Sequence, residues 1–281
     1  MQDFFKKDSI VLLVDDYQQF FQDHIYHYEY LEKWKLDCDS LENFFQFHGF
    51  DLDCRKAFAI DTFVQHGVLP YNLIRMQNAL KYAMIEKNLS SILRISADLG
   101  HYIGDAHVPL HTHSNYNGQQ TDQLGIHAFW ETRLPELFAD ADYDYFVGKA
   151  TYIEDIETHY WQIVKESHAL VETVLQIEKE LSAIFPKDQQ LCFVERGEGY
   201  VQKMACEEYA KLYHEKLNGQ VESRFRAAIK AVGNAWYTAW VDAGQPDLLA
   251  IFDNQKLKQV AEEQQLLKEA TRNNKIFGRE H

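Results

Sequence analysis

The sequence has few basic residues, few residues that break helices and no long apolar run. Lys and Arg number 28 against 43 Asp and Glu, which gives a formal net charge of −15. This deficit argues against a protein that coats duplex nucleic acid, because such binding needs a basic surface that displaces counterions. No stretch approaches the roughly 20 consecutive apolar residues that cross a bilayer, so we expect no transmembrane segment.

The chain also lacks two patterns that would place it outside the cell. Its first seven residues contain neither the basic nor the apolar region of a signal peptide, so we expect the chain as given to be cytoplasmic. Its few cysteines are widely spaced and include no C-x-x-C pair, a pattern that favours reduced or buried thiols over a thiolate metal site or a disulfide framework. These cysteines are Cys38, Cys54, Cys192 and Cys206.

Only five prolines and thirteen glycines interrupt the chain, and apolar residues recur at helical spacing between them. This pattern predicts an all-α fold with a single multi-helical domain over residues 1–248. Residues 249–281 are charged and rich in glutamine, which is typical of a surface helix or a frayed end. The predicted helices span residues 71–86, 91–107, 122–138, 152–181, 199–217 and 221–241, and the apolar stripe of the last consists of Val221, Phe225, Ala228, Ile229, Val232, Trp236, Ala239 and Trp240.

Residues 101–131 concentrate side chains that bind metals. His101 and Asp105 lie four residues apart on one predicted helix, and His127 and Glu131 repeat this spacing on the next. Side chains four apart leave the same face of a helix, so each pair can converge on one ion. Imidazole and carboxylate are ligands that zinc accepts, and helical proteins commonly build metal sites from facing helices.

A proline between the two pairs adds a further predicted ligand. Pro109 ends the first helix, so the chain bends and His111 can turn back toward the same pocket. His107 lies about 200° around the helix from Asp105 and is expected to point away, while His113 belongs to the following loop; each is otherwise a solvated or hydrogen-bonded surface histidine. The alternative for the whole group is a buried polar network that joins two helices, but two pairs and a fifth histidine favour a metal.

The pattern H-x-x-x-D-x-x-x-P-L-H followed by H-x-x-W-[DE] resembles the signature of the zinc-dependent phospholipase C and S1/P1 nuclease superfamily. The similarity extends over roughly residues 45–248 and is to uncharacterised bacterial members. It implies an all-α fold of that type with three zinc ions in a cleft, and hydrolysis of a phosphodiester by metal-bound water. By this resemblance Asp105 is catalytic and bridges two metals with His101 nearby, whereas His111, His127 and Glu131 hold the third.

The beginning of the chain departs from the family pattern. Family members use a processed N-terminal tryptophan and a following histidine, but this chain begins MQDFFKKD and has neither. We therefore expect a lost or remodelled N-terminal region, with 1–44 divergent and the signal peptide of these usually exported proteins missing. The nearest match to a further family motif is His48 in HGFD, accompanied by Asp37 or Asp39. Two or three zinc ions are expected, or fewer if this part of the cluster is lost.

The resemblance and the loop between the two helices indicate a substrate. Tyr116 and Asn117 lie in a polar, glycine-containing loop, which suits contact with substrate, although a plain connecting loop is the alternative. The expected substrate is a phosphate ester such as a phospholipid or single-stranded nucleic acid, without stable binding to duplexes. Glu131 favours the phospholipase branch. The competing hypothesis is a non-catalytic helical protein that is stabilised by metal and retains only His111, His127 and Glu131.

Overall fold

The structure is a computed structural model that describes residues 33–35, 58–60, 67–195, 201–251 and 265. It divides the chain into two compact units, Met1–Gly67 and Val68–His281. The described part of the first unit is an antiparallel pair of strands, β1 (Lys33–Lys35) and β2 (Phe58–Ile60). The predicted ligands Asp37 and His48, and almost all of the predicted tail, lie outside the described residues.

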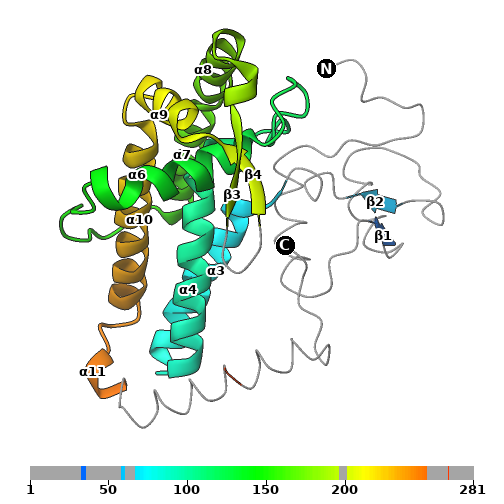
Figure 1. Ribbon diagram of the computed structural model, residues 1–281. Coiled ribbons are helices and arrows are strands. Elements are labelled where there is room, and N and C mark those ends of the chain that lie inside the picture. Colours follow the sequence, from blue (N-terminus) through cyan, green and yellow to red (C-terminus); the bar gives the residue numbers. More distant parts are fainter. Residues whose placement is uncertain (1–32, 36–57, 61–66, 196–200, 252–264, 266–281) are drawn as a thin grey trace. The chain divides into compact units, whose positions relative to one another are not determined.

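The second unit is mostly helical, as predicted (Figure 1). None of the described helices is long and apolar enough to cross a membrane. The helices are α3 (Leu69–Ile85), α4 (Leu89–Ala106), α5 (Ile126–Ala128), α6 (Leu134–Asp142), α7 (Ile156–His168), α8 (Val171–Ile184), α9 (Glu207–Lys216), α10 (Gln220–Asp242) and α11 (Leu248–Ile251), and the strands are β3 (Leu191–Glu195) and β4 (Val201–Ala205). Short helical turns span Pro109–Thr112, Phe129–Arg133 and Lys187–Gln189.

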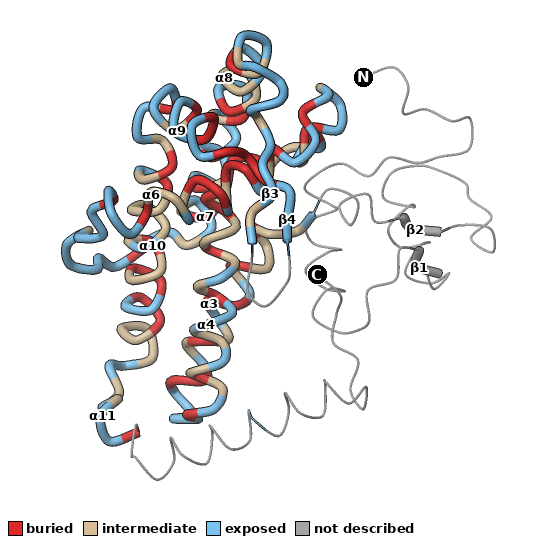
Figure 2. Tube along the Cα trace, in the orientation of Figure 1, coloured by how far each residue is buried: buried red, intermediate tan, exposed pale blue. Residues whose placement is uncertain are grey.

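Buried side chains of this unit form two hydrophobic clusters, and Figure 2 marks the buried positions in red along the helices. The first lies among α3, α4, α7 and α10, with Leu80, Leu99 and Tyr160 fully buried. The second lies among α6, α8, α9 and the start of α10, with Trp130 and Tyr213 almost fully buried. The chain passes from the first cluster to the second at the end of α4, so the bend predicted at Pro109 lies where the two cores meet.

The predicted helix 152–181 is two helices, because its residues face different cores. Asp155 caps the start of α7 by accepting a hydrogen bond from the Thr158 amide at 3.0 Å. The chain then turns after His168, where the Leu170 amide donates to the Ser167 carbonyl at 3.1 Å. This turn lets α7 place Tyr160 in the first cluster while α8 contributes to the second, which one straight helix cannot do.

The apolar stripe predicted for α10 is partly wrong. Ile229 and Trp236 are 39% and 43% exposed, whereas polar Asn234 and Thr238 are buried. These two side chains are buried because they accept hydrogen bonds from the amides of Thr151 and Ile153, at 2.8 and 2.9 Å, in an extended segment beside α10. The buried positions of α10 are Val221, Arg224, Ala231, Asn234, Ala235, Thr238 and Ala239.

The region after α8 differs from both sequence predictions made for it. Residues 201–205 form strand β4, so the predicted helix 199–217 is confirmed only as α9. The hairpin pairs Leu191 with Ala205, and this register brings Cys192 and Cys206 together as a disulfide with their Cα atoms 5.0 Å apart. The prediction of free thiols is therefore wrong for this pair, because strand pairing joins cysteines that show no motif in sequence. Cys38 and Cys54 lie outside the described residues.

Candidate metal centre

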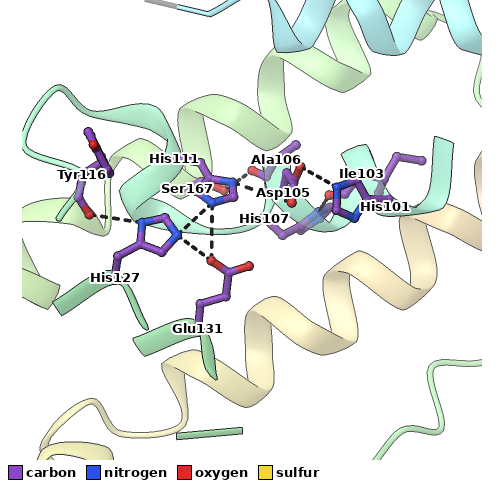
Figure 3. Close-up of polar contacts among 10 residues, drawn as sticks. All are labelled: His101, Ile103, Asp105, Ala106, His107, His111, Tyr116, His127, Glu131 and Ser167. Atoms are coloured by element: carbon purple, nitrogen blue, oxygen red, sulfur yellow. Dashed lines mark hydrogen bonds and ion pairs between the residues drawn. The ribbon is translucent and has the colours of Figure 1, made fainter. Parts of the chain in front are cut away.

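Three predicted ligands converge at the junction of the two cores (Figure 3). The Nε2 atoms of His111 and His127 are 3.0 Å apart, and Glu131 Oε2 lies 3.4 Å from the first and 2.7 Å from the second. All three atoms lie within 4.8 Å of one another. Their side chains are 24–34% exposed, so the group is partly shielded yet still accessible to solvent.

The triangle formed by these atoms has the size that a small divalent ion requires. Nitrogen and oxygen ligands lie about 2.0–2.1 Å from a tetrahedral zinc ion, which places them about 3.3 Å from one another. The three separations of 2.7–3.4 Å approach this value. Movements of a few tenths of an ångström are therefore sufficient for His111, His127 and Glu131 to hold the ion, with a fourth position left for another ligand.

A bond from the preceding loop orients His127. Its Nδ1 atom lies 3.2 Å from the carbonyl oxygen of Tyr116. The Nδ1–H group donates to this carbonyl, so Nε2 faces the cluster, where it hydrogen-bonds to Glu131 and, once deprotonated, offers its lone pair to a metal. The Tyr116 ring meets the His127 ring edge to face at 6.1 Å and is 54% exposed, which leaves it accessible beside the cluster, as a substrate contact requires.

The loop that carries Tyr116 is held in shape by its own polar groups. Buried Asn115 donates to Thr121 Oγ1 at 2.9 Å, and the amide oxygen of Asn117 accepts from the Gly125 amide at 3.1 Å. Gly118 has a φ of +75°, and a Cβ atom there would lie 2.2 Å from the Gln123 carbonyl oxygen, so only glycine fits. Asn117, predicted to contact substrate, thus also holds the loop together.

Glu131 belongs to a π-helical turn, Phe129–Arg133, of a kind that often occurs at functional sites. The turn is anchored by buried Trp130, whose Nε1 donates to Gln220 at 3.1 Å. Hydrogen bonds from His111 and His127 lower the pKa of Glu131 to about 2 against the opposing effect of burial. At neutral pH this side chain is therefore a carboxylate, the form that binds cations.

His111 is held between two carboxylates. Burial lowers the pKa of His111, but its hydrogen bond to Glu131 and the charges of Glu131 and Asp105 outweigh burial and raise this pKa above its usual value. Without a metal the imidazole tends to keep its proton, because the positive charge of the protonated ring is attracted to the two carboxylates. A metal ion must displace that proton in order to bind at Nε2.

His101 and Asp105 lie next to this group rather than within it. Asp105 Oδ2 is 3.5 Å from His101 Nε2, and Asp105 Oδ1 is 3.8 Å from His111 Nδ1, the ring nitrogen opposite the cluster. Asp105 thus faces the back of a predicted ligand, and the His101 side chain is 62% exposed. Among the described residues, only His111, His127 and Glu131 form a group close enough to hold one ion.

The two remaining histidines of the segment have structural bonds. His107 is 4% exposed and its Nδ1 donates to the Ile103 carbonyl at 2.7 Å, so the prediction of a surface histidine is wrong. Its burial lowers its pKa to about 4. His113 accepts from the Asn115 amide at 2.9 Å and stacks on His168.

A catalytic zinc site can have two imidazoles and one carboxylate as its protein ligands, with the fourth position left open. An incomplete metal cluster would show the same three side chains. Arg224 and Ser167 bond to the end of α4 behind the site, and the sequence did not predict either of them. Only the polarity of a few positions on otherwise apolar helix faces could have indicated them.

No protein-family model, curated protein or solved structure matches this chain.

Proposed function

We propose that this protein is a zinc-dependent phosphodiesterase in which His111, His127 and Glu131 hold an ion. The observation that carries the proposal is the convergence of two Nε2 atoms and one carboxylate oxygen to separations of 2.7–3.4 Å. The resemblance of the sequence motif to the phospholipase C and S1/P1 nuclease superfamily supports the reaction type. The proposal includes the fold of that superfamily and, with His101 and Asp105, a set of two or three ions.

The side chains around the cluster have distinct parts in this proposal. A bound zinc ion supplies a Lewis acid for the phosphoryl oxygens and lowers the pKa of water toward neutrality. Tyr116 keeps His127 in the ligand tautomer through its carbonyl and offers an exposed ring to the substrate. Asp105, with a side chain 23% exposed, is a second carboxylate beside the cluster and can hold a cation or accept a proton there.

The substrate proposed is a phosphate ester with a small or flexible backbone, such as a phospholipid or single-stranded nucleic acid. The formal net charge of −15 opposes broad binding to the phosphates of a duplex. A local cation at His111, His127 and Glu131 would attract one phosphoryl group without a basic surface.

A second function is favoured by one specific observation. Asp105 lies 3.8 Å behind His111 and does not join the three-residue group. An isolated ion held by His111, His127 and Glu131 would stabilise the junction of the two cores without catalysis. Under this alternative, the protein is a helical protein that a metal ion stabilises and that has no catalytic activity.

One experiment separates the two functions. Zinc-reconstituted protein is assayed on a chromogenic phosphodiester, phosphatidylcholine, single-stranded DNA and RNA, beside His127→Ala, Asp105→Ala and the control His159→Ala on α7. The enzyme hypothesis predicts turnover of at least one substrate, abolished in the first two variants and retained in the control. Zinc binding without turnover of any substrate would favour the stabilising role, and turnover that persists in His127→Ala would contradict the proposed site.

A further inference from the structure

The carbonyl groups at the end of α4 all have hydrogen-bond donors. Donors from the same turn bind the carbonyls of Ile103, Gly104 and Asp105. The next two carbonyls are bound from other helices: Ala106 by Ser167 Oγ at 2.6 Å and His107 by Arg224 Nε at 3.2 Å. Because a helix end normally leaves its last carbonyls unpaired, this arrangement fixes the end of α4 to α7 and α10.

Arg224 joins these bonds into one network. It lies on α10, is only 7% exposed, and donates to Ser167 Oγ at 2.7 Å as well as to the His107 carbonyl. The same guanidinium reaches the Ile163 carbonyl and the Glu166 carboxylate, each at 3.4 Å. A planar group with several donors in fixed directions therefore ties α4 to α7, and its positive charge lies at a helix end where carbonyl groups point.

The network borders the turn that carries His111. Ser167 binds Ala106 where the chain enters the turn, as Figure 3 shows. At the exit, His168 Nδ1 lies 3.1 Å from Thr112 Oγ1 and 3.2 Å from the Thr112 carbonyl. The last two residues of α7 thus hold both ends of the segment from Ala106 to Thr112, and His111 Nε2 can occupy its place in the metal cluster only if this segment keeps its direction.

We propose that Arg224 is a positioning residue of the metal centre, which acts through Ser167 and the His107 carbonyl to fix the direction of the turn that carries His111. This inference rests on the proposed metal binding by His111, His127 and Glu131. Arg224 does not touch the metal. It sets the distance between His111 Nε2 and the other two ligand atoms, in the way that groups behind a ligand tune metal affinity elsewhere.

The test compares Arg224→Met and Ser167→Ala with a matched control, Arg226→Met. Arg226 lies two residues further along α10 and also binds backbone carbonyls, but in the exposed segment at Asp144 and Phe146. The full chain is titrated with Zn²⁺ against a chromophoric chelator, and the visible spectrum of the Co²⁺ form reports the ligand geometry. Thermal unfolding in EDTA measures the stability of each metal-free variant separately.

The expected result is a loss of about 10- to 100-fold in Zn²⁺ affinity and an altered Co²⁺ spectrum in Arg224→Met. Ser167→Ala, which removes only one oxygen, should show a smaller loss in the same direction, and the double variant should lose less than the sum of the two. Arg226→Met should bind like the wild type. Wild-type affinity and spectrum in Ser167→Ala and in any folded Arg224→Met, with lowered melting temperatures alone, would overturn the positioning role. A wild type that binds no metal would instead refute the metal site itself.

Discussion

The buried imidazole of His107 should make the protein sensitive to mild acid. Its pKa is lowered by burial from 6.5 to about 4, and its side chain lies next to the core at the end of α4. Above pH 6.5 the ring is neutral in both the folded and the unfolded chain, so it imposes no penalty. Below pH 6.5 the unfolded chain takes up a proton that the folded chain does not. The free energy of unfolding therefore decreases as the pH is lowered from 6.5 to about 4.

The size of this effect follows from the two pKa values. Each pH unit between them removes about 1.4 kcal/mol from the free energy of unfolding, so the whole interval removes about 3 kcal/mol. His107→Asn removes the titrating ring and places an amide N–H where His107 Nδ1 donates to the Ile103 carbonyl. The variant loses some packing at neutral pH, but its stability should fall less steeply toward pH 4.

Urea unfolding in EDTA, followed by circular dichroism at several values between pH 7 and pH 4, measures both proteins. The difference in unfolding free energy between wild type and His107→Asn should shift by about 3 kcal/mol in favour of the variant across this range. His159, whose pKa is also lowered by burial, remains in both proteins, so its own titration contributes to both curves. A difference that stays constant with pH would refute the assignment of a buried, neutral ring to His107.

Three further predictions concern single features of the site and its scaffold. Glu131→Gln keeps the shape of the side chain but removes its charge, so Zn²⁺ affinity, measured by chelator competition, should fall at least about tenfold; equal affinity would contradict its role as a ligand. Gly118→Ala requires a strained backbone and a contact with the Gln123 carbonyl, so the melting temperature should drop by an amount equivalent to at least about 1 kcal/mol; no drop would contradict the described turn. Replacing Cys192 and Cys206 by serine should cost about 2–4 kcal/mol in urea unfolding under oxidising conditions, and the variant should match the wild type once both are measured with reductant.

The helices and the three residues of the candidate metal group were predictable from sequence because both depend on local spacing. Apolar periodicity locates α3 and α4, and the four-residue spacing of His127 and Glu131 places both on one face of the chain. Proline at position 109 correctly indicated the bend that returns His111 to that face. To predict these features from the sequence, only the geometry of one or two helical turns has to be known.

Other features depend on contacts between distant segments, which spacing does not encode. The disulfide arises from strand pairing between residues 14 apart in sequence. Arg224 is buried because carbonyl groups of α4 and α7 meet it, whereas Arg226 is half-buried, and only the helical spacing of Arg224 from Val221 and Ala231 could have indicated the difference. His107 is buried because the helix side opposite Asp105 faces the interior, so a side chain that points away from Asp105 points into the protein rather than into water.

The most direct test of the account is the metal content of the purified chain. Protein stripped with EDTA, reloaded with Zn²⁺ and dialysed exhaustively is measured by elemental analysis beside His127→Ala and the control His159→Ala. We expect about one zinc ion or more per chain in the wild type and the control, and a clear loss in His127→Ala. Zinc at background level in the wild type, or equal zinc in His127→Ala, would contradict a metal centre at His111, His127 and Glu131.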